Sequence, residues 1–308
     1  MGRGSLRECR GLLHSIQSSS SLPTPTTNCV ILHAEYLRFE FLSLTGDRIP
    51  LLVKMRRLAE RLSRGVVLRR RLPSTFHNLP IYVTPEAGLR YWLSMSRVDQ
   101  ALQGMVEELV HPGSIVWDVG ANVGLFSFCA AALAGKSGSV LSIEPDLYLA
   151  QLMMRSAREL ARRRLACSNV EVLCASVSDS NRISKLEIAE RARASNHLLD
   201  TSGSPEAGGS RYLQPTPSVT LDFLLDYFPA PSVLKIDVET HEANVLRGAQ
   251  RVLKEARPTI LCEVSHQNSD EVTQLLHGAG YELYGAEIRP HPLTNRAWFQ
   301  TLAVPVGS

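Results

Sequence analysis

The chain has 308 residues, of which 44% are hydrophobic and 20% charged, and its formal net charge is +3. This length can bury the core of one large domain, and the composition excludes wholesale disorder. No stretch of about 18 apolar residues occurs, so the sequence predicts no membrane-spanning helix.

The positive charge is concentrated near the N-terminus, where residues 48–71 hold nine Lys and Arg and a single acid, Glu60. Such a stretch suits phosphate or an anionic membrane surface. It is also typical of a solvated helix face followed by a charged linker, the interpretation we favour. Residues 114–308 are slightly acidic, so we expect no nucleic-acid partner. The six irregularly spaced cysteines predict reduced thiols in a cytoplasmic protein, without a disulfide framework or zinc site.

The first third of the chain shows few regular patterns. Residues 1–28 are rich in Ser and Arg, and we expect a disordered tail, with a transit peptide as the alternative. Residues 29–96 are interpreted as an accessory region. Within it we expect strand-like alternation at 30–43, a helix over 52–64 and a short strand at 81–83.

The hydrophobic spacing of residues 97–110 predicts a helix that ends before His111-Pro112-Gly113. From residue 114 onwards, β-branched runs alternate with helical spacing. Strands are predicted at 114–119, 139–144, 170–174, 232–237, 259–264, 281–285 and 298–304. Helices are predicted at 123–134, 146–164, 241–255 and 269–278. This alternation predicts an α/β domain with a doubly wound, mostly parallel sheet. The polar segment 189–217 is expected to be a long loop, either flexible or an active-site lid.

The strongest functional signal is DVGANVG, which runs from Asp118 to Gly124 between a predicted strand and a predicted helix. Ligands of open α/β sheets bind beyond the carboxyl ends of the strands, near the switch point, where this turn would lie. A dinucleotide loop has glycines spaced G-x-G-x-x-G, whereas here they are spaced G-x-x-x-G after an acid. A carboxylate repels pyrophosphate but attracts an ammonium or sulfonium, so S-adenosylmethionine is favoured over NAD. A tight turn without a ligand is the structural alternative.

Two further signals end later strands. Glu144, in SIEP, is placed to accept hydrogen bonds from both ribose hydroxyls of a nucleotide cofactor, although charged residues also end strands without a ligand. In KIDVETHE, Lys235 and Asp237 share one face of the strand, and pairing lets both stay charged when buried. The local alternative is that Thr240 caps the next helix while acids complement its dipole. We favour that alternative for Glu242 but not for Asp237.

In combination, these segments resemble the FkbM-type methyltransferases. The resemblance rests on DVGANVGLFSF, SIEPD, LKIDVETHEANVLRGAQRVL and RPTILCEV, and it covers about residues 97–285 in the family's order. It implies a seven-stranded Rossmann-like methyltransferase sheet within a domain at 97–308, and S-adenosylmethionine as the cofactor. It also implies methyl transfer to oxygen on a sugar, glycan, polyketide or other secondary metabolite.

The resemblance implies roles for single residues by position. The cofactor-binding residues are Asp118, Gly120, Ala121, Asn122 and Gly124 along the methionine part, Glu144 at the ribose and Ser176 near the adenine. The family usually has glycine where this chain has Thr240, which is strained if the position needs a positive φ. Asp99 is a loose counterpart of an upstream family glutamate. RASNH at 193–197 resembles a family segment, which brings Asn196 toward the site.

Methyl transfer mainly requires alignment of the acceptor with the methyl group, and a hydroxyl acceptor also needs a base. We expect Asp237 to be that base or to orient the acceptor, with His241 as its rival and Lys235 and Glu239 beside them. A magnesium ion on Asp237, Glu239 and Glu263 is a less favoured alternative.

Two alternative functions are an NAD-linked oxidoreductase and a non-catalytic cofactor-binding module. The glycine spacing disfavours the first, and only Thr240 points to the second. The expected partner is a small-molecule or glycan hydroxyl acceptor.

Overall fold

The computed structural model describes residues 58–92, 95–190, 192–199 and 209–307. The chain divides into two compact units, Met1–Gly46 and Asp47–Ser308, and every described residue belongs to the second. The predicted tail at 1–28 and the strand-like segment at 30–43 lie outside the described residues. Of the helix predicted at 52–64, residues 58–62 are described and helical.

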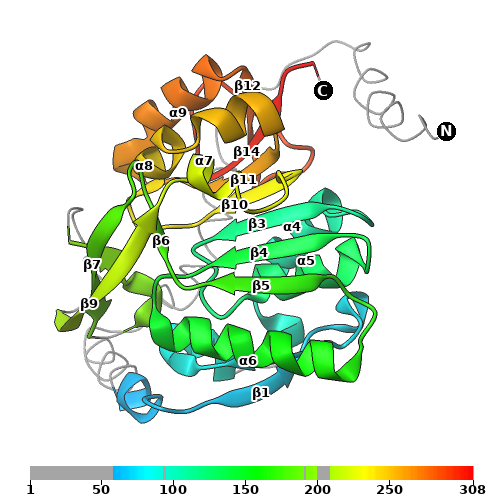
Figure 1. Ribbon diagram of the computed structural model, residues 1–308, viewed down its shortest axis with the longest axis vertical. Helices are drawn as coiled ribbons and strands as arrows, with labels where there is room; N and C mark the ends of the chain where they lie inside the picture. Colours follow the sequence, from blue (N-terminus) through cyan, green and yellow to red (C-terminus); the bar gives the residue numbers. More distant parts are fainter. Residues whose placement is uncertain (1–57, 93–94, 191, 200–208, 308) are drawn as a thin grey trace, which may run out of the picture. The chain divides into compact units, whose positions relative to one another are not determined.

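A mostly parallel sheet of eight strands forms the centre of this unit (Figure 1). Its order is β13-β12-β14-β11-β10-β3-β4-β5, and β11, β10, β3, β4 and β5 are joined by parallel pairing. The strands are Ile115–Val119 (β3), Ser139–Ile143 (β4), Asn169–Leu173 (β5), Val233–Ile236 (β10), Thr259–Glu263 (β11), Tyr281–Gly285 (β12), Leu293–Thr294 (β13) and Gln300–Pro305 (β14). The seven strands predicted from residue 114 onwards are therefore all present. The sheet has one strand more than the expected seven, because the two-residue β13 extends its edge.

Helices cover both faces of this sheet (Figure 1). One hydrophobic core joins the sheet to α4 (Gln100–Leu109), α5 (Leu125–Ala134) and α6 (Leu147–Arg163). A second core joins it to α7 (Leu221–Leu224), α8 (Glu242–Arg247) and α9 (Ser269–Gly278). Side chains along a strand alternate between the two cores, as Val116 and Trp117 do in β3. The predicted doubly wound architecture is thus confirmed.

The helix predicted at 241–255 is not continuous. It ends at Arg247, and a π-helical segment, Val252–Ala256, follows. Gly248 explains the break, because a Cβ at this position would lie 2.2 Å from the carbonyl oxygen of Ser178. The close approach of another segment, which hydrophobic periodicity does not report, therefore interrupts the helix.

The described part of the expected accessory region joins the first core. Strands β1 (Leu68–Arg71) and β2 (Pro80–Val83) form an antiparallel pair beside α6, and β2 contains the predicted strand at 81–83. Short 3₁₀ helices follow at Ser74–Phe76 (η1), Pro85–Ala87 (η2), Leu89–Trp92 (η3) and Met95–Arg97 (η4). Phe76 and Tyr91 are fully buried, and each large apolar side chain buried in this way contributes about 1.5–3 kcal/mol.

A smaller sheet, in the order β6-β9-β7-β8, lies beyond the carboxyl ends of β3, β4 and β5 (Figure 1). Its strands are Ser176–Val177 (β6), Arg182–Ala189 (β7), His197–Leu198 (β8) and Ser210–Val219 (β9), with a 3₁₀ turn at Arg193–Ser195 (η5). The prediction of a long loop over 189–217 is wrong at 197–198 and from 210 onwards. Pro215 and Pro217 hid β9, because proline is disfavoured inside a paired strand. Residues 200–208 lie outside the described part. None of the described helices has the length and hydrophobicity that a membrane span requires.

Candidate functional site

Three strand ends that carry the sequence signals lie side by side. Strand β3 pairs with β10 on one side and with β4 on the other, and all three are parallel. The pairing sets Lys235 next to Asp118, while Glu144 follows β4. The next strand of this sheet along the chain, β4, lies on one side of β3, and the later strand β10 lies on the other side. The strand order therefore reverses at β3, which makes this the topological switch point. The glycine turn therefore lies at the switch point, as predicted, and a ligand site there stays a prediction.

A buried ion-pair network lies beneath these turns. The Lys235 ammonium is 3.0 Å from Asp237 Oδ2 and 3.4 Å from Asp118 Oδ1. Burial opposes its charge, but the two carboxylates outweigh burial and hold the pKa of Lys235 above its usual value. Asp118 is fully buried, and its Oδ2 accepts a hydrogen bond of 2.5 Å from Ser127. Lys235 and Ser127 thus already compensate the charge of Asp118. The sequence alone did not reveal these partners when it favoured a cationic cofactor.

The backbone of the glycine turn is bonded within the protein. Of the five N–H groups from Gly120 to Gly124, two donate to the carbonyl of Ile143 and one to that of Ala121. A fourth, on Asn122, donates to Glu144 Oε2 at 2.8 Å. Phosphate-binding loops instead direct their N–H groups at the ligand. This turn therefore has few donors left for a phosphate.

The same turn holds one buried oxygen with no hydrogen-bond or charge partner among the described residues, Oδ1 of Asn122, and Asn122 adopts a φ of 56°. Oδ1 of Asp118 accepts no hydrogen bond, but the Lys235 ammonium lies 3.4 Å from it. Buried polar atoms without a partner are uncommon, and some of them mark ligand positions. The Asn122 oxygen is an acceptor, so it suits a ligand that donates hydrogen bonds or carries positive charge.

Glu144 is buried and connects two turns. Its oxygens accept hydrogen bonds of 2.8 Å from the backbone N–H groups of Asn122 and Asp146. Burial raises the pKa of Glu144 to about 8. A carboxyl group offers about four lone-pair sites, so the two bonds leave capacity for the ribose hydroxyls of a nucleotide. The ribose role stays a prediction.

Asp146, two residues after Glu144, was missed from the sequence although an Asp before a helix is an N-cap signal. It caps α6, and its Oδ2 accepts hydrogen bonds from Arg193 at 2.6 Å and Asn196 at 2.8 Å. The RASNH segment therefore does lie against the turn that follows β4. Ser176, by contrast, donates to the carbonyl of Pro217 in the smaller sheet, and its role near the adenine stays a prediction.

The turn after β3 also touches the turn after β10. Gly120 has a φ of 78°, and a Cβ on it would lie 1.8 Å from the carbonyl oxygen of Asp237. No side chain fits there whatever ligand binds, so packing between the two turns already requires glycine.

A cavity of about 60 Å³ opens beside the turn after β10. It is lined by Asp237, Val238, Glu239, Thr240, Glu242, Glu263, Ser265 and Phe299. The structure thus brings Asp237, Glu239 and Glu263 together, and it adds Phe299, which no sequence signal indicated. Burial, and next the charge of Asp237, raises the pKa of Glu263 to about 8. Within the described ranges, no group of three or more His, Cys, Asp or Glu has the arrangement of a metal site.

His241 does not line this cavity. It is 3% exposed, and its Nε2 lies 2.9 Å from the hydroxyl of Ser178. Lys235 lies beneath Asp237 rather than on the cavity wall. Of the four expected catalytic residues, only Asp237 and Glu239 therefore face the cavity.

A family model described as the methyltransferase FkbM domain matches residues 118–283, more than half of the chain. The chain belongs to the FkbM methyltransferase family. No curated protein matches the chain.

Solved structures similar to this FkbM protein include an FkbM methyltransferase from Methylobacillus flagellatus, 17% identical, with a TM-score of 0.42. That match covers 65% of this chain and 50% of the other, so the chain spans half the length of that structure. A second is a precorrin-6Y C5,15-methyltransferase from Geobacter metallireducens, which is 14% identical; the match covers 67% of this chain and 87% of that one, with a TM-score of 0.39. A third is an S-adenosylmethionine-dependent O-methyltransferase from Thermotoga maritima, which is 12% identical; the match covers 68% of this chain and 66% of that one, with a TM-score of 0.38.

This FkbM-family chain departs from the expected family pattern at Thr240, which has a φ of 58°. The position therefore does adopt the left-handed conformation that favours glycine. The prediction that Thr240 caps the next helix is wrong, because the N-cap of α8 is His241. The Asn268 amide instead bonds both the Thr240 carbonyl and the Glu242 carboxylate. Asp99 caps α4 and pairs with Arg90, so its side chain is used locally.

Proposed function

We propose that this FkbM-family protein is an S-adenosylmethionine-dependent O-methyltransferase whose acceptor is a hydroxyl of a sugar, glycan or other secondary metabolite. The observation that carries the choice of cofactor is the bonding of the glycine turn. Four of the five N–H groups from Gly120 to Gly124 are used within the protein, one of them by the Glu144 carboxylate. A pyrophosphate would meet that carboxylate and few donors, which disfavours the NAD-linked alternative.

The residues present fit the proposed cofactor. Oδ1 of Asn122 is an acceptor for its ammonium, and Glu144 is placed for its ribose. When bound, S-adenosylmethionine supplies a methyl group that its sulfonium has already activated. The protein then has mainly to hold the acceptor in line.

Asp237 is the residue we assign to the acceptor hydroxyl. Its side chain is 43% exposed, and it lines the cavity beside the turn after β10. The Lys235 ammonium lies 3.0 Å from its carboxylate, and a carboxylate so placed can accept the hydroxyl proton. Glu239, Glu263 and Phe299 also line this cavity, so a hydroxyl-bearing group that enters it would meet both acidic and apolar side chains.

The test compares S-adenosylhomocysteine with NAD in a thermal-shift assay on the full chain. A ligand that binds only the folded state stabilises it by about 2.7 kcal/mol at 100 times its Kd. We expect S-adenosylhomocysteine to raise the melting temperature by about 5–10 °C and NAD to leave it unchanged. Asn122→Asp, which adds a charge beside Glu144, serves as the site variant. Stabilisation by NAD alone would refute the choice of cofactor.

A screen of hydroxylated metabolites with methyl-labelled S-adenosylmethionine then tests the reaction. We expect label in an ether product. Cofactor binding without transfer to any acceptor would support the non-catalytic module instead, and label on nitrogen or carbon would refute O-methylation.

A further inference from the structure

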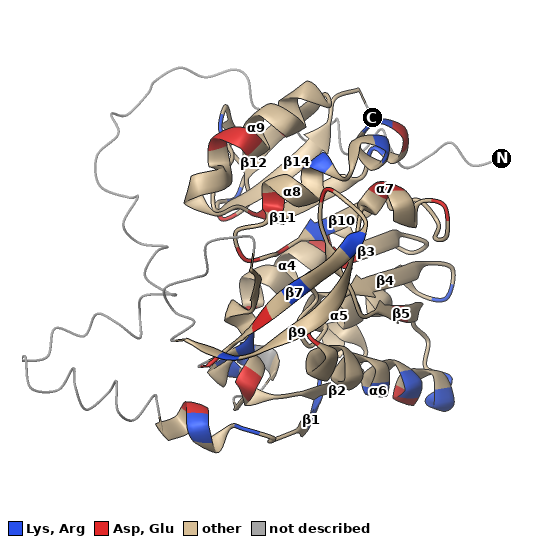
Figure 2. Ribbon diagram, turned by 60° about the vertical axis from the view of Figure 1, so that its left-hand side comes forward, with Lys and Arg blue, Asp and Glu red and all other residues tan. Residues whose placement is uncertain are grey.

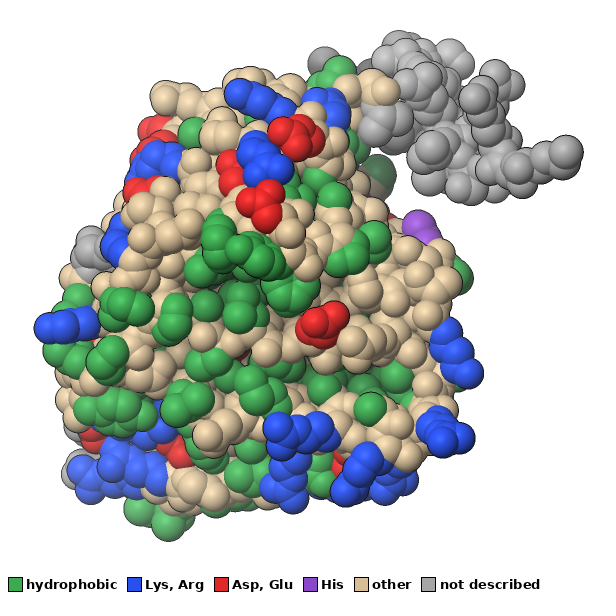
Figure 3. Space-filling view, viewed as in Figure 1, with side chains coloured by type: hydrophobic (Ala, Val, Ile, Leu, Met, Phe, Trp, Pro, Cys, Tyr) green, Lys and Arg blue, Asp and Glu red, His purple; other side chains and the backbone are tan. Residues whose placement is uncertain are grey.

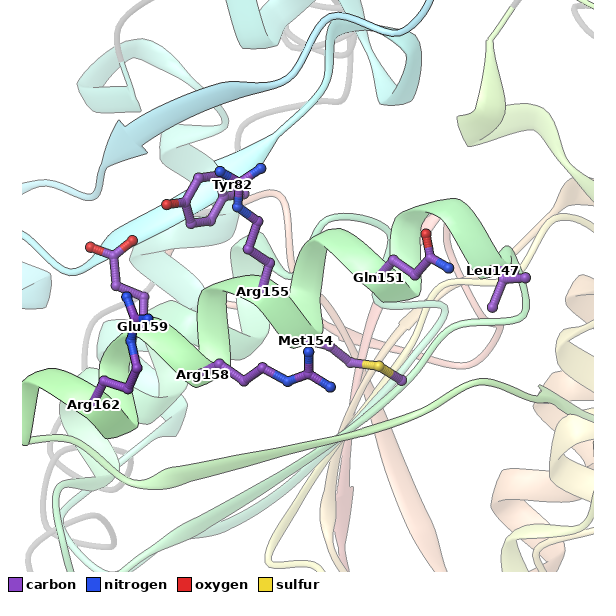
Figure 4. A pocket seen from close by; sticks show the side chains of 8 residues that line it. All are labelled: Tyr82, Leu147, Gln151, Met154, Arg155, Arg158, Glu159 and Arg162. Atoms are coloured by element: carbon purple, nitrogen blue, oxygen red, sulfur yellow. The ribbon is translucent and has the colours of Figure 1, made fainter.

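A groove of about 740 Å³ runs along the outer side of α6, from Leu147, next to the turn after β4, to Arg162 (Figure 4). It is lined by Tyr82, Leu147, Gln151, Met154, Arg155, Arg158, Glu159 and Arg162. Except for Tyr82, these residues all come from α6, where each lies one, three or four positions after the one before it. They therefore form one stripe along the helix.

The groove carries positive charge that the described part of the protein does not neutralise. Glu159, its only acid, is already paired with Arg69 at 2.6 Å and Arg163 at 2.8 Å. Within the described ranges, Arg155, Arg158 and Arg162 form no ion pair, and Arg155 stacks 3.8 Å from the ring of Tyr82. Three like charges within two helical turns repel one another, so an anion bound there would be stabilised.

Basic residues from the N-terminal stretch meet α6 on the same side of the molecule. Arg69 of β1 donates hydrogen bonds to Glu159 of α6. The helical turn at 58–62 lies near the start of β1 in two views (Figures 1 and 2). We define the arginine face as the exposed arginines of these elements that pair with no carboxylate among the described residues. They are Arg61, Arg71, Arg155, Arg158, Arg162 and Arg164. Figure 3 shows Lys and Arg side chains gathered along the edge formed by α6, with few acids between them.

Exposed apolar side chains flank the arginine face. Leu58 and Leu62 are 58% and 66% exposed, and they stand four residues apart on one side of the helical turn. Leu147, at the start of the groove, is 49% exposed. Basic residues mixed with protruding leucines are typical of surfaces that bind the membrane interface.

We propose that the arginine face docks the protein on an anionic membrane surface, with the arginines against lipid headgroups and Leu58 and Leu62 inserted among the acyl chains. The leucines favour a membrane over a nucleic acid, since stacking bases need open aromatic rings. The ring that lines the groove, Tyr82, is covered by Arg155. The described end of the basic stretch, residues 58–71, is thus one part of a surface that α6 completes.

The test is co-sedimentation of the full chain with vesicles of phosphatidylcholine alone or with 30% phosphatidylserine. We expect binding only to the anionic vesicles and its loss in 0.5 M salt. Each arginine near such a surface strengthens binding about fivefold, so Arg155→Gln, Arg158→Gln and Arg162→Gln together should weaken it by roughly 100-fold. The matched control, R247Q/R251Q/R296Q, removes the same charge from exposed residues outside the face and should bind like the wild type.

A second variant, Leu58→Ala with Leu62→Ala, should weaken binding without changing its salt dependence. Circular dichroism checks that all variants fold. Equal losses in the α6 variant and its control would overturn the proposal, because net charge alone would then explain binding. So would binding to neutral vesicles, a failure to sediment with anionic ones, or tighter binding to an oligonucleotide that depends on the same arginines.

Discussion

Replacement of Thr240 by glycine should stabilise this protein. Thr240 has a φ of 58°, and the left-handed conformation costs an L-residue about 1–2 kcal/mol, with a β-branched residue at the upper end. Glycine removes this cost but adds about 0.5–1 kcal/mol of unfolded-state entropy. The difference is a gain of about 1 kcal/mol, which corresponds to a rise of about 2–4 °C in melting temperature for a domain of this size. The side-chain amide of Asn268 donates a hydrogen bond to the backbone carbonyl of residue 240, which glycine retains, so this bond survives the change.

Two control variants isolate the cause. Thr240→Ala keeps a Cβ at the same φ and should gain little. Thr220→Gly makes the same substitution at a φ of −87°, where the threonine caps α7, and should lose stability. Equilibrium denaturation in urea gives the three free energies of unfolding. If Thr240→Ala stabilises the protein as much as Thr240→Gly, the lost side-chain contacts and not the backbone conformation are responsible, and the reasoning fails.

Three further predictions concern the site. Asp237→Asn should abolish methyl transfer while S-adenosylhomocysteine still binds, and normal turnover by this variant would contradict the assignment. His241→Ala should mainly lower the melting temperature, because the His241 ring is buried against Ser178. Gly120→Ala should destabilise the protein by about 4 kcal/mol through its clash with the Asp237 carbonyl, while Gly65→Ala, at a φ of 71° with no other atom within 4 Å of the added Cβ, should cost only about 1–2 kcal/mol in urea denaturation. Because burial raises the pKa of Glu144 to about 8 from an ordinary 4.5, the folded protein holds a proton that the unfolded chain releases, and stability should fall between about pH 5 and 8. Burial also raises the pKa of Glu263 to about 8, so Glu144→Gln should reduce that slope without abolishing it, and an unchanged slope would refute the contribution of Glu144.

Local patterns in the sequence were sufficient to predict the long strands and the meeting of the three turns that carry the sequence signals. Alternation of β-branched runs with helical spacing marks a doubly wound sheet, and parallel strands direct their carboxyl ends to one edge. That is why DVGANVG, SIEP and KIDVETHE could be expected to meet, and they do so on β3, β4 and β10. The family glycine at the position of Thr240 left open whether a positive φ is needed there, and the structure shows that it is, with a φ of 58°.

Contacts between distant segments decided the rest, and no local pattern reports them. The partners of Asp118 lie 9 and 117 positions along the chain, at Ser127 and Lys235, so its charge balance was invisible in the sequence. Strand β9 forms despite its prolines because β7 pairs along nearly its whole length. Phe299 reaches the cavity only because β14 returns beside β11, and the arginine face exists only because β1 packs near α6. Sequence periodicity describes one element at a time, whereas a charge network, a cavity or a surface depends on which elements the folded chain brings together.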